Sequence, residues 1–334
     1  MILYDQFHRP LENIRISVID RCNFRCAYCM PSDQFPQNYP FLRQANLLTF
    51  EEITHLVALF SQLGVYRVRL TGGEPLIRPH LEHLIAMIAD IDGISDISLT
   101  TNGYLLPNKA RILHTAGLKR LNISLDSLDE TVFQRMNGGR ASVGDVLKGI
   151  EAAERAGFAP IKINTVVQQG VNDHTLLDLA LHFRQRGHTV RFIEFMDVGT
   201  LNGWHPEQVL WSDRIVKQLS AIAPLEPLPV NYPGEVARRY RYLDGSGDVG
   251  FITSVSQPFC GDCNRLRLSA EGKLYTCLFA QQGIDFREGL RFGESDESLR
   301  ERITQVWHGR TDRYSEERDA HRDLARVEMF HIGG

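Results

Sequence analysis

Short runs of apolar, often β-branched residues alternate along the first two thirds of the chain with longer segments whose apolar residues recur at helical spacing. The short runs predict strands at Ile14–Ile19, Tyr66–Leu70, Ile94–Thr100, Leu121–Leu125, Ile161–Val167 and Val190–Phe195. The longer segments predict helices at Thr49–Leu63, His80–Ile91, Lys109–Ala116, Val143–Ala156 and His174–Arg186. Strands joined by helical crossovers predict a parallel sheet.

Six predicted strands are fewer than the eight that close a full barrel. We therefore predict an α/β fold, an open partial (βα)6 barrel of the TIM type, with a doubly wound sheet as the alternative because periodicity does not fix strand order. Ligand sites lie at the carboxyl ends of parallel strands. The polar residues expected at that mouth are Asp20, Thr71, Thr100, Ser124 and Glu194, with Lys162 a little upstream.

The alternation stops after Phe195, and an extension of different character follows. The proline-rich segment Pro224–Pro233 indicates a surface linker. Two β-hairpins are predicted beyond it, one from Tyr240–Tyr242 with Phe251–Val255 and one from Leu266–Leu268 with Lys273–Cys277. We expect two domains, a barrel at 1–225 and an extension at 226–334.

Size and charge narrow the class of protein. The 334 residues are 43% apolar, which supports one large α/β domain or one domain with a sizeable extension. A net charge of −4 argues against a nucleic-acid or membrane-surface binder. No apolar stretch is long enough for a membrane span, and Met1–Pro10 lacks the apolar core of a signal peptide. We expect a cytoplasmic protein, whose reduced cysteines suggest metal or redox chemistry.

The six cysteines stand in two triplets with none left over. Cys22, Cys26 and Cys29 have the spacing C-x3-C-x2-C directly after the first predicted strand, whereas Cys260, Cys263 and Cys277 decorate the second hairpin region. Structural zinc and closed iron–sulfur cubes take four protein ligands. Each triplet of thiolates therefore predicts its own cube, with one iron left open. Zinc remains the alternative for each triplet, with His8 as the nearest fourth ligand for the first.

The first triplet, with the aromatic Tyr28 before its last cysteine, resembles that of the radical S-adenosylmethionine superfamily. The resemblance covers the whole predicted barrel. It implies a four-iron, four-sulfur (4Fe–4S) cluster whose open iron is chelated by S-adenosylmethionine, and whose electron releases a 5′-deoxyadenosyl radical.

The segment Thr71-Gly72-Gly73-Glu74-Pro75 follows the second predicted strand. Its two glycines let the backbone approach a ligand closely, although a tight turn explains them as well. The superfamily binds the methionine group at this place. The contacts to S-adenosylmethionine that the resemblance implies are Tyr28, Gly73, Glu74, Ser124 and Met196.

The second triplet is followed by Arg265 and Arg267, which alternate on a strand and therefore point to one face. Guanidinium groups suit phosphate oxygens, although arginines on a solvated face are the bland alternative. This stretch, with the barrel, resembles the GTP 3′,8-cyclase family of molybdenum cofactor biosynthesis over nearly the entire chain. The resemblance implies a second 4Fe–4S cluster that contacts guanine. It also implies GTP contacts at Arg15, Arg69, Thr100, Lys162, Arg265 and Arg267.

The family further implies the product (8S)-3′,8-cyclo-7,8-dihydroguanosine 5′-triphosphate, a reducing electron donor and a downstream pyranopterin monophosphate synthase that receives the product. A homodimer is possible. The terminal Gly333-Gly334 matches a tail that reaches toward the family's active site, whereas we assign no role to Asp197–Trp204 or Arg310–Arg326. The alternative functions are a radical enzyme that modifies peptides with the help of an auxiliary cluster, and a non-catalytic zinc-binding module.

Overall fold

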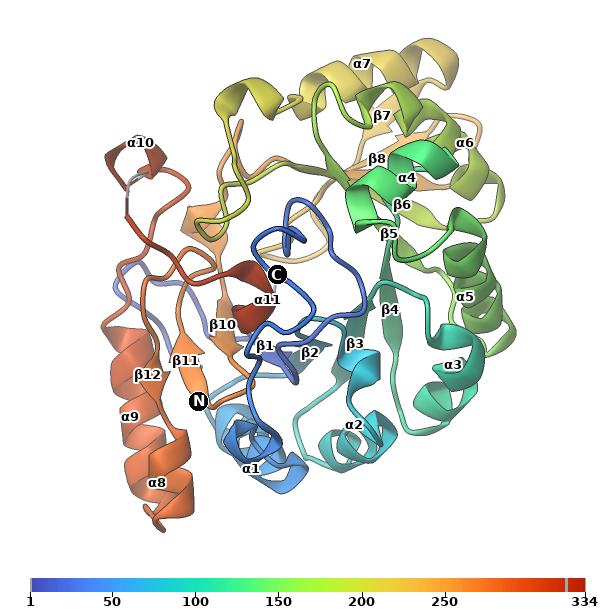
Figure 1. The fold of residues 1–334 in the computed structure, drawn as a ribbon. Helices are drawn as coiled ribbons and strands as arrows, with labels where there is room; N and C mark the ends of the chain where they lie inside the picture. The colour runs from blue at the N-terminus through green and yellow to red at the C-terminus, as the bar shows by residue number, and fades with distance from the viewer. Residues whose placement is uncertain (1, 322–323, 334) are drawn as a thin grey trace.

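The computed structural model describes residues 2–321 and 324–333, and it forms one open twelve-stranded sheet in the described part of the chain (Figure 1). The strand order is β12-β11-β10-β1-β2-β3-β4-β5-β6-β9-β8-β7. The strands are β1 (Asn13–Ser17), β2 (Arg67–Thr71), β3 (Asp96–Thr101), β4 (Arg120–Ser124), β5 (Lys162–Val167), β6 (Thr189–Glu194), β7 (Leu225–Pro227), β8 (Arg238–Tyr242), β9 (Asp248–Ile252), β10 (Arg265–Leu268), β11 (Lys273–Tyr275) and β12 (Ile284–Asp285).

Strands β1 to β6 lie in sequence order, and each pairs in parallel with the next. In a doubly wound sheet the order of the strands reverses at an inner strand. The unbroken order from β1 to β6 therefore confirms the predicted partial barrel. Apolar side chains on these strands, such as Ile14, Leu70 and Ile163, are fully buried.

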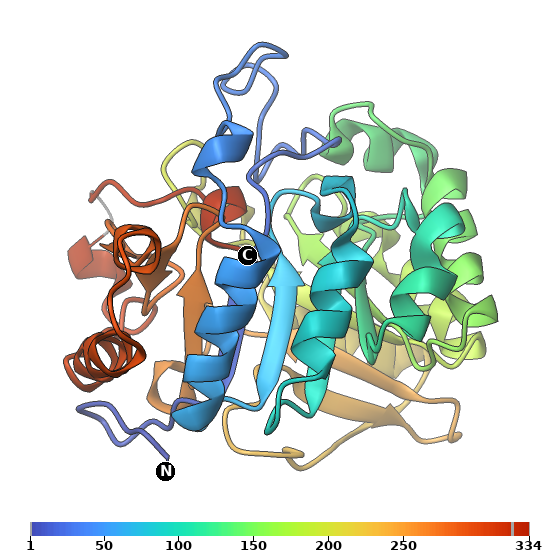
Figure 2. The ribbon, with the colours of Figure 1, turned by 90° about the horizontal axis from the view of Figure 1, so that it is seen from below.

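Helices cover the outer face of the sheet, and α1, α2 and α3 lie side by side in front of the strands in Figure 2. Helix α1 begins with a capping box, since Thr49 and Glu52 exchange hydrogen bonds at its start. The helices are α1 (Phe50–Gln62), α2 (Leu81–Ala89), α3 (Leu106–Thr115), α4 (Glu130–Asn137), α5 (Val143–Arg155), α6 (Leu176–Gln185), α7 (Ser212–Ile222), α8 (Arg287–Arg291), α9 (Asp296–His308), α10 (Arg318–His321) and α11 (Met329–Ile332).

The extension lengthens the same sheet at both edges. Strand β10 pairs in parallel with β1, and β9 pairs in parallel with β6. Both predicted hairpins are present, as β8–β9 and β10–β11. The predicted domain boundary therefore lies within a continuous sheet.

One expectation about the extension was wrong in part. The segment Pro224–Pro233 is not all linker, because β7 pairs with β8. The extension also contains helices that the sequence patterns did not predict, with α7 packed against β6 and α9 against α1. In the described part of the chain, none of the helices combines the length and apolar content that crossing a bilayer requires.

Candidate active site between two cysteine triplets

The loops that follow β1, β2 and β3 interlock at the mouth of the sheet. The amide of Gly73 donates to the carbonyl of Ile19 over 2.8 Å, and the amide of Glu74 donates to that of Arg21 over 2.8 Å. A Cβ atom on Gly73 would lie 2.1 Å from the Arg21 carbonyl oxygen, so glycine is required here. The loop carrying Cys22 is thus held directly against the glycine pair.

The Glu74 carboxylate orders this junction. It accepts hydrogen bonds from the backbone of Leu76 (3.0 Å) and Asn102 (2.8 Å) and from the hydroxyl of Thr101 (2.7 Å). Burial raises its pKa to about 7 despite these donors. Its oxygens are therefore already engaged within the protein, and the expected contact to a ligand amine stays a prediction.

The thiols of the first triplet are within electrostatic reach of one another. Burial raises the pKa of Cys22 to about 12, and it also raises the pKa values of Cys26 and Cys29. A metal must therefore displace protons to bind here, as thiolate sites generally require.

Tyr28 lies inside this loop and points toward β4. Its hydroxyl donates to the Asp126 carboxylate over 2.9 Å, and burial raises the pKa of Asp126 to about 6. Sequence reasoning assigned no role to Asp126, although its place directly after β4 was the available signal. Ser124 ends β4 and Met196 follows β6, so both stand at carboxyl strand ends.

The second triplet has a different electrostatic environment. Burial opposes ionisation of Cys263, but Arg265 and Arg310 outweigh it and lower the pKa to about 5. Arg265 donates to the Cys263 Sγ from Nη2 (3.1 Å) and Nε (3.4 Å). Burial raises the pKa of Cys277 to about 12. The two arginines therefore favour the thiolate form of Cys263, which is the form that binds a metal.

A buried ionic network supports the loop that carries Cys260 and Cys263. Arg9 donates to the Cys260 carbonyl over 2.8 Å, and Arg310 donates to the Cys263 carbonyl over 2.6 Å. Both guanidinium groups face the Asp5 carboxylate, whose Oδ2 lies 2.5 Å from Arg9 Nε and 3.5 Å from Arg310 Nη1. Sequence reasoning missed this support, which joins residues about three hundred positions apart in the chain.

Neither triplet has the dimensions of a mononuclear zinc site. Among the described residues, the set of three potential ligand atoms within 4.8 Å of one another is His80, Glu82 and His83. Thiolates around zinc stand about 3.8 Å apart, given Zn–S bonds of about 2.3 Å. A cube holds its cysteines farther apart, so the donor set fits an iron–sulfur cluster better.

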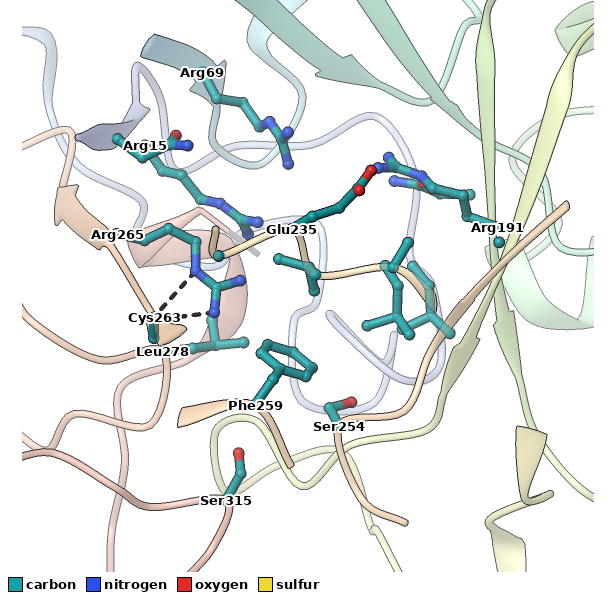
Figure 3. A pocket seen from close by; sticks show the side chains of 18 of the residues that line it. Arg15, Arg69, Arg191, Glu235, Ser254, Phe259, Cys263, Arg265, Leu278 and Ser315 are labelled. Carbon is teal, nitrogen blue, oxygen red and sulfur yellow. Dashed lines mark hydrogen bonds between the residues drawn. The ribbon is translucent and has the colours of Figure 1, made fainter. Parts of the chain in front are cut away.

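A cavity of about 330 Å³ lies beside the second triplet, inside the sheet (Figure 3). Its lining includes Cys260, Cys263, Cys277 and Met196 together with all six predicted substrate contacts, Arg15, Arg69, Thr100, Lys162, Arg265 and Arg267. Tyr28, Gly73, Glu74 and Ser124 lie outside this lining, at the neighbouring loops.

Three arginines stand side by side across adjacent strands. Arg15 on β1 is in register with Arg267 on β10 and with Arg69 on β2. Burial and mutual repulsion lower the pKa of Arg15, while burial is also the main cause that lowers the pKa of Arg69 to about 10 and that of Arg267 to about 9. Like charges in a row are unfavourable without an anion. The row therefore predicts a polyanionic ligand.

Arg191 adds a cation that sequence reasoning missed. It faces the cavity from the side opposite Arg15 and Arg69, with Glu235 pointing toward it (Figure 3). Its guanidinium donates to Asn164 over 2.9 Å and to Asn122 over 2.7 Å. The two-residue alternation of β6 was the available signal, since it places Arg191 on the same face as Ile193.

The C-terminal tail also reaches the site. The carbonyl oxygen of Gly333 accepts a hydrogen bond from Arg267. Helix α11 lies beside the loop after β1, in the mouth of the sheet (Figure 1). Gly334 lies outside the described residues. By contrast, Glu194 anchors the extension, because its carboxylate accepts from the backbone of Val255 and Ser256.

Two family models match the chain. Residues 16–183 match the radical SAM superfamily, and residues 188–316 match Molybdenum Cofactor Synthesis C. The predicted boundary at residue 225 stays a prediction.

Curated relatives named GTP 3′,8-cyclase match nearly the whole chain. The protein of Xanthomonas axonopodis pv. citri is 51% identical over 99% of both chains. That of Acidothermus cellulolyticus is 50% identical over 96% of this chain and 90% of its own. The protein of Staphylococcus haemolyticus is 43% identical over 99% of this chain and 98% of its own.

Solved structures share the fold at low identity. Streptococcus suis SuiB bound to S-adenosylmethionine superposes with a TM-score of 0.63 at 13% identity, covering 92% of this chain and 70% of that one. SuiB bound to its precursor peptide SuiA superposes with a TM-score of 0.60 at 12% identity, covering 91% of this chain and 66% of that one.

Proposed function

The chain belongs to the GTP 3′,8-cyclase family of the radical S-adenosylmethionine superfamily, and from this premise we propose that it converts GTP to (8S)-3′,8-cyclo-7,8-dihydroguanosine 5′-triphosphate in molybdenum cofactor biosynthesis. The observation that carries the proposal is the row Arg267–Arg15–Arg69, which lines a cavity beside the second cysteine triplet. A triphosphate is the anion that such a row suits.

The two triplets hold the two 4Fe–4S clusters, one on Cys22, Cys26 and Cys29 and the other on Cys260, Cys263 and Cys277. When bound, the first cluster and S-adenosylmethionine supply the radical that removes the 3′-hydrogen of the ribose. The residues that bind S-adenosylmethionine are Tyr28, Gly73, Glu74, Ser124 and Met196. In this division, residues 1–225 hold the radical source and residues 226–334 hold the auxiliary cluster.

The chain's own cations bind and orient the substrate. Arg15, Lys162, Arg265 and Arg267 neutralise the triphosphate, while Arg69 and Thr100 make further contacts to the nucleotide. The purine lies against the second triplet. The new bond joins C3′ and C8 of one molecule, so a closed cavity that fixes ribose and purine in the conformation that brings these two atoms together lowers the entropy cost of forming it.

The wider setting of the reaction is part of the proposal. A separate reductant supplies electrons to the clusters, and a pyranopterin monophosphate synthase receives the product. Reducing conditions keep six free cysteines available for metal, so we place the protein in the cytoplasm. A homodimer is compatible with this function.

The test is anaerobic incubation of the reconstituted protein with reductant, S-adenosylmethionine and GTP deuterated at the ribose 3′ position. We expect deuterium in 5′-deoxyadenosine and a cyclised nucleotide, and we expect R265A/R267A to abolish GTP use. Deoxyadenosine that carries no deuterium, with GTP left unchanged, would overturn the proposal. A peptide-modifying enzyme would tolerate the two arginine replacements.

A further inference from the structure

Asp197, directly after Met196 at the end of β6, is the buried centre of an ionic network. Its carboxylate accepts from the Tyr314 hydroxyl over 2.5 Å and from Arg318 Nε over 3.0 Å. Both partners belong to the segment after α9. The side chain of Asp197 is 3% exposed, so these two contacts occur away from solvent, where breaking them is costly.

The tail returns to the same place after α10. Arg326 donates to the Tyr314 hydroxyl over 2.8 Å, and its Nη2 lies 3.9 Å from the Asp197 carboxylate. Two residues later, Glu328 accepts from the amide of Thr200 over 2.8 Å and from its hydroxyl over 3.0 Å. The loop after β6 therefore holds the tail at several points.

Beyond these anchors, the tail contacts the catalytic half of the molecule. Phe330 belongs to an apolar cluster with Met30 and Phe35, and Cys29 packs against this cluster. The Phe330 ring packs edge-on against Phe35, with centroids 5.1 Å apart. Gly333 then accepts from Arg267, one of the arginines in the cavity. One short segment thus connects a ligand of the first triplet with a cation of the cavity.

We propose that Asp197 is a positioning residue, which docks the tail (residues 310–321 and 324–333) across the mouth of the sheet so that Phe330 packs beside the first triplet and Gly333 restrains Arg267. Without its charge, Arg318 and Arg326 lose their shared counter-ion and the tail detaches. Water then reaches the cavity, and radical formation becomes uncoupled from cyclisation. This part of the inference rests on the proposed function.

The first test uses hydrogen–deuterium exchange of the full-length, cluster-loaded protein. D197N is expected to accelerate exchange in residues 324–333 on the order of tenfold, because local protection depends on docking. The matched control is E154Q, which removes the charge from a carboxylate bonded to Arg186 and His188, near the start of β6 and away from the end that Asp197 follows. Unchanged exchange of the tail in D197N would overturn the proposal.

The second test measures the ratio of 5′-deoxyadenosine formed to cyclised nucleotide formed. We expect D197N to raise this ratio, and we expect removal of residues 329–334 to raise it as well. Because both changes act through the tail, the variant that combines them should have the same ratio as the truncation alone. Additive effects would overturn the proposal. If D197N does not fold, E328Q replaces it, since its partner Thr200 lies at the surface. If the wild-type protein makes no cyclised nucleotide, the proposed function fails, whereas the exchange measurement still decides whether Asp197 docks the tail.

Discussion

Lys162 on β5 and Arg191 on β6 are diagonal neighbours in one cavity, because Lys162 pairs in register with Thr189 and Asn164 pairs with Arg191. Burial, and next the charge of Arg191, lower the pKa of Lys162 to about 7. The ammonium group is therefore poised to change its charge when an anion arrives.

We predict that GTP binding takes up a proton at pH 8. The free protein then holds Lys162 mainly neutral, and a bound triphosphate favours the cation. Affinity should accordingly fall as pH rises above about 7, by up to about tenfold per pH unit through this group. Calorimetry in two buffers of different ionisation enthalpy measures the uptake.

Lys162→Met is the control for this measurement, because it removes the titrating group. Equal proton uptake in wild type and variant would refute the assignment.

The lowered pKa of Lys162 also affects stability. Since the pKa lies below the unfolded value of 10.5, ligand-free wild type should lose stability as pH falls from about 10.5 to about 7.

Gly73→Ala should separate the loops after β1 and β2. The added Cβ would lie 2.1 Å from the Arg21 carbonyl oxygen and 3.0 Å from the Cys22 amide, and neither is a flexible atom. We expect iron to drop from about eight to about four per chain, with loss of S-adenosylmethionine cleavage. Iron and sulfide analysis measures this.

The matched control is Gly144→Ala in α5, where the nearest atom to the new Cβ is the Ser142 hydroxyl at 3.7 Å. It should keep all its iron and gain about 0.5–1 kcal/mol of stability from helix propensity. A Gly73→Ala protein with its full iron content would show that the close approach is dispensable.

The ligand chemistry was largely predictable from local sequence. The spacing of Cys22, Cys26 and Cys29 belongs to one loop, and alternation alone places Arg265 and Arg267 on one face. The row Arg267–Arg15–Arg69 was not predictable in this way. It depends on β10 returning to pair with β1, and a register between strands so distant in sequence leaves no local pattern.

The missed features have two different causes. Helix α9 carries a stripe of Leu299, Ile303 and Trp307 at four-residue spacing, which its dense charge obscured. The contacts of Asp197 with Tyr314 and Arg318 leave no trace in periodicity, because they join polar residues more than a hundred positions apart. Such contacts follow only from the completed fold.

Arg265→Met should make the second cluster harder to reduce. Arg265 donates two hydrogen bonds to the Cys263 sulfur, and hydrogen bonds to cysteine sulfur together with nearby positive charge stabilise the reduced cluster. A redox titration followed by electron paramagnetic resonance should show a more negative potential than wild type. Arg267→Met, whose parent residue bonds Gly333, should shift it less. Equal potentials for wild type and Arg265→Met would contradict this role.

Asp5→Asn should weaken the fold and the second metal site together. The Asp5 carboxylate lies between Arg9 and Arg310, and these arginines hold the carbonyls of Cys260 and Cys263. Removing the charge leaves two buried guanidinium groups without this partner, which costs about 3–5 kcal/mol of unfolding free energy. Urea denaturation and iron retention during anaerobic dialysis measure both effects.

The surface pair Glu297–Arg300 provides the comparison, because Glu297 is 75% exposed. Glu297→Gln should change the unfolding free energy by no more than about 1 kcal/mol and leave iron retention unaltered. If Asp5→Asn behaved like this surface variant, the network around Asp5 would not be what holds the loop of the second triplet. If it lost stability yet kept its iron, the network would serve the fold and not the metal site.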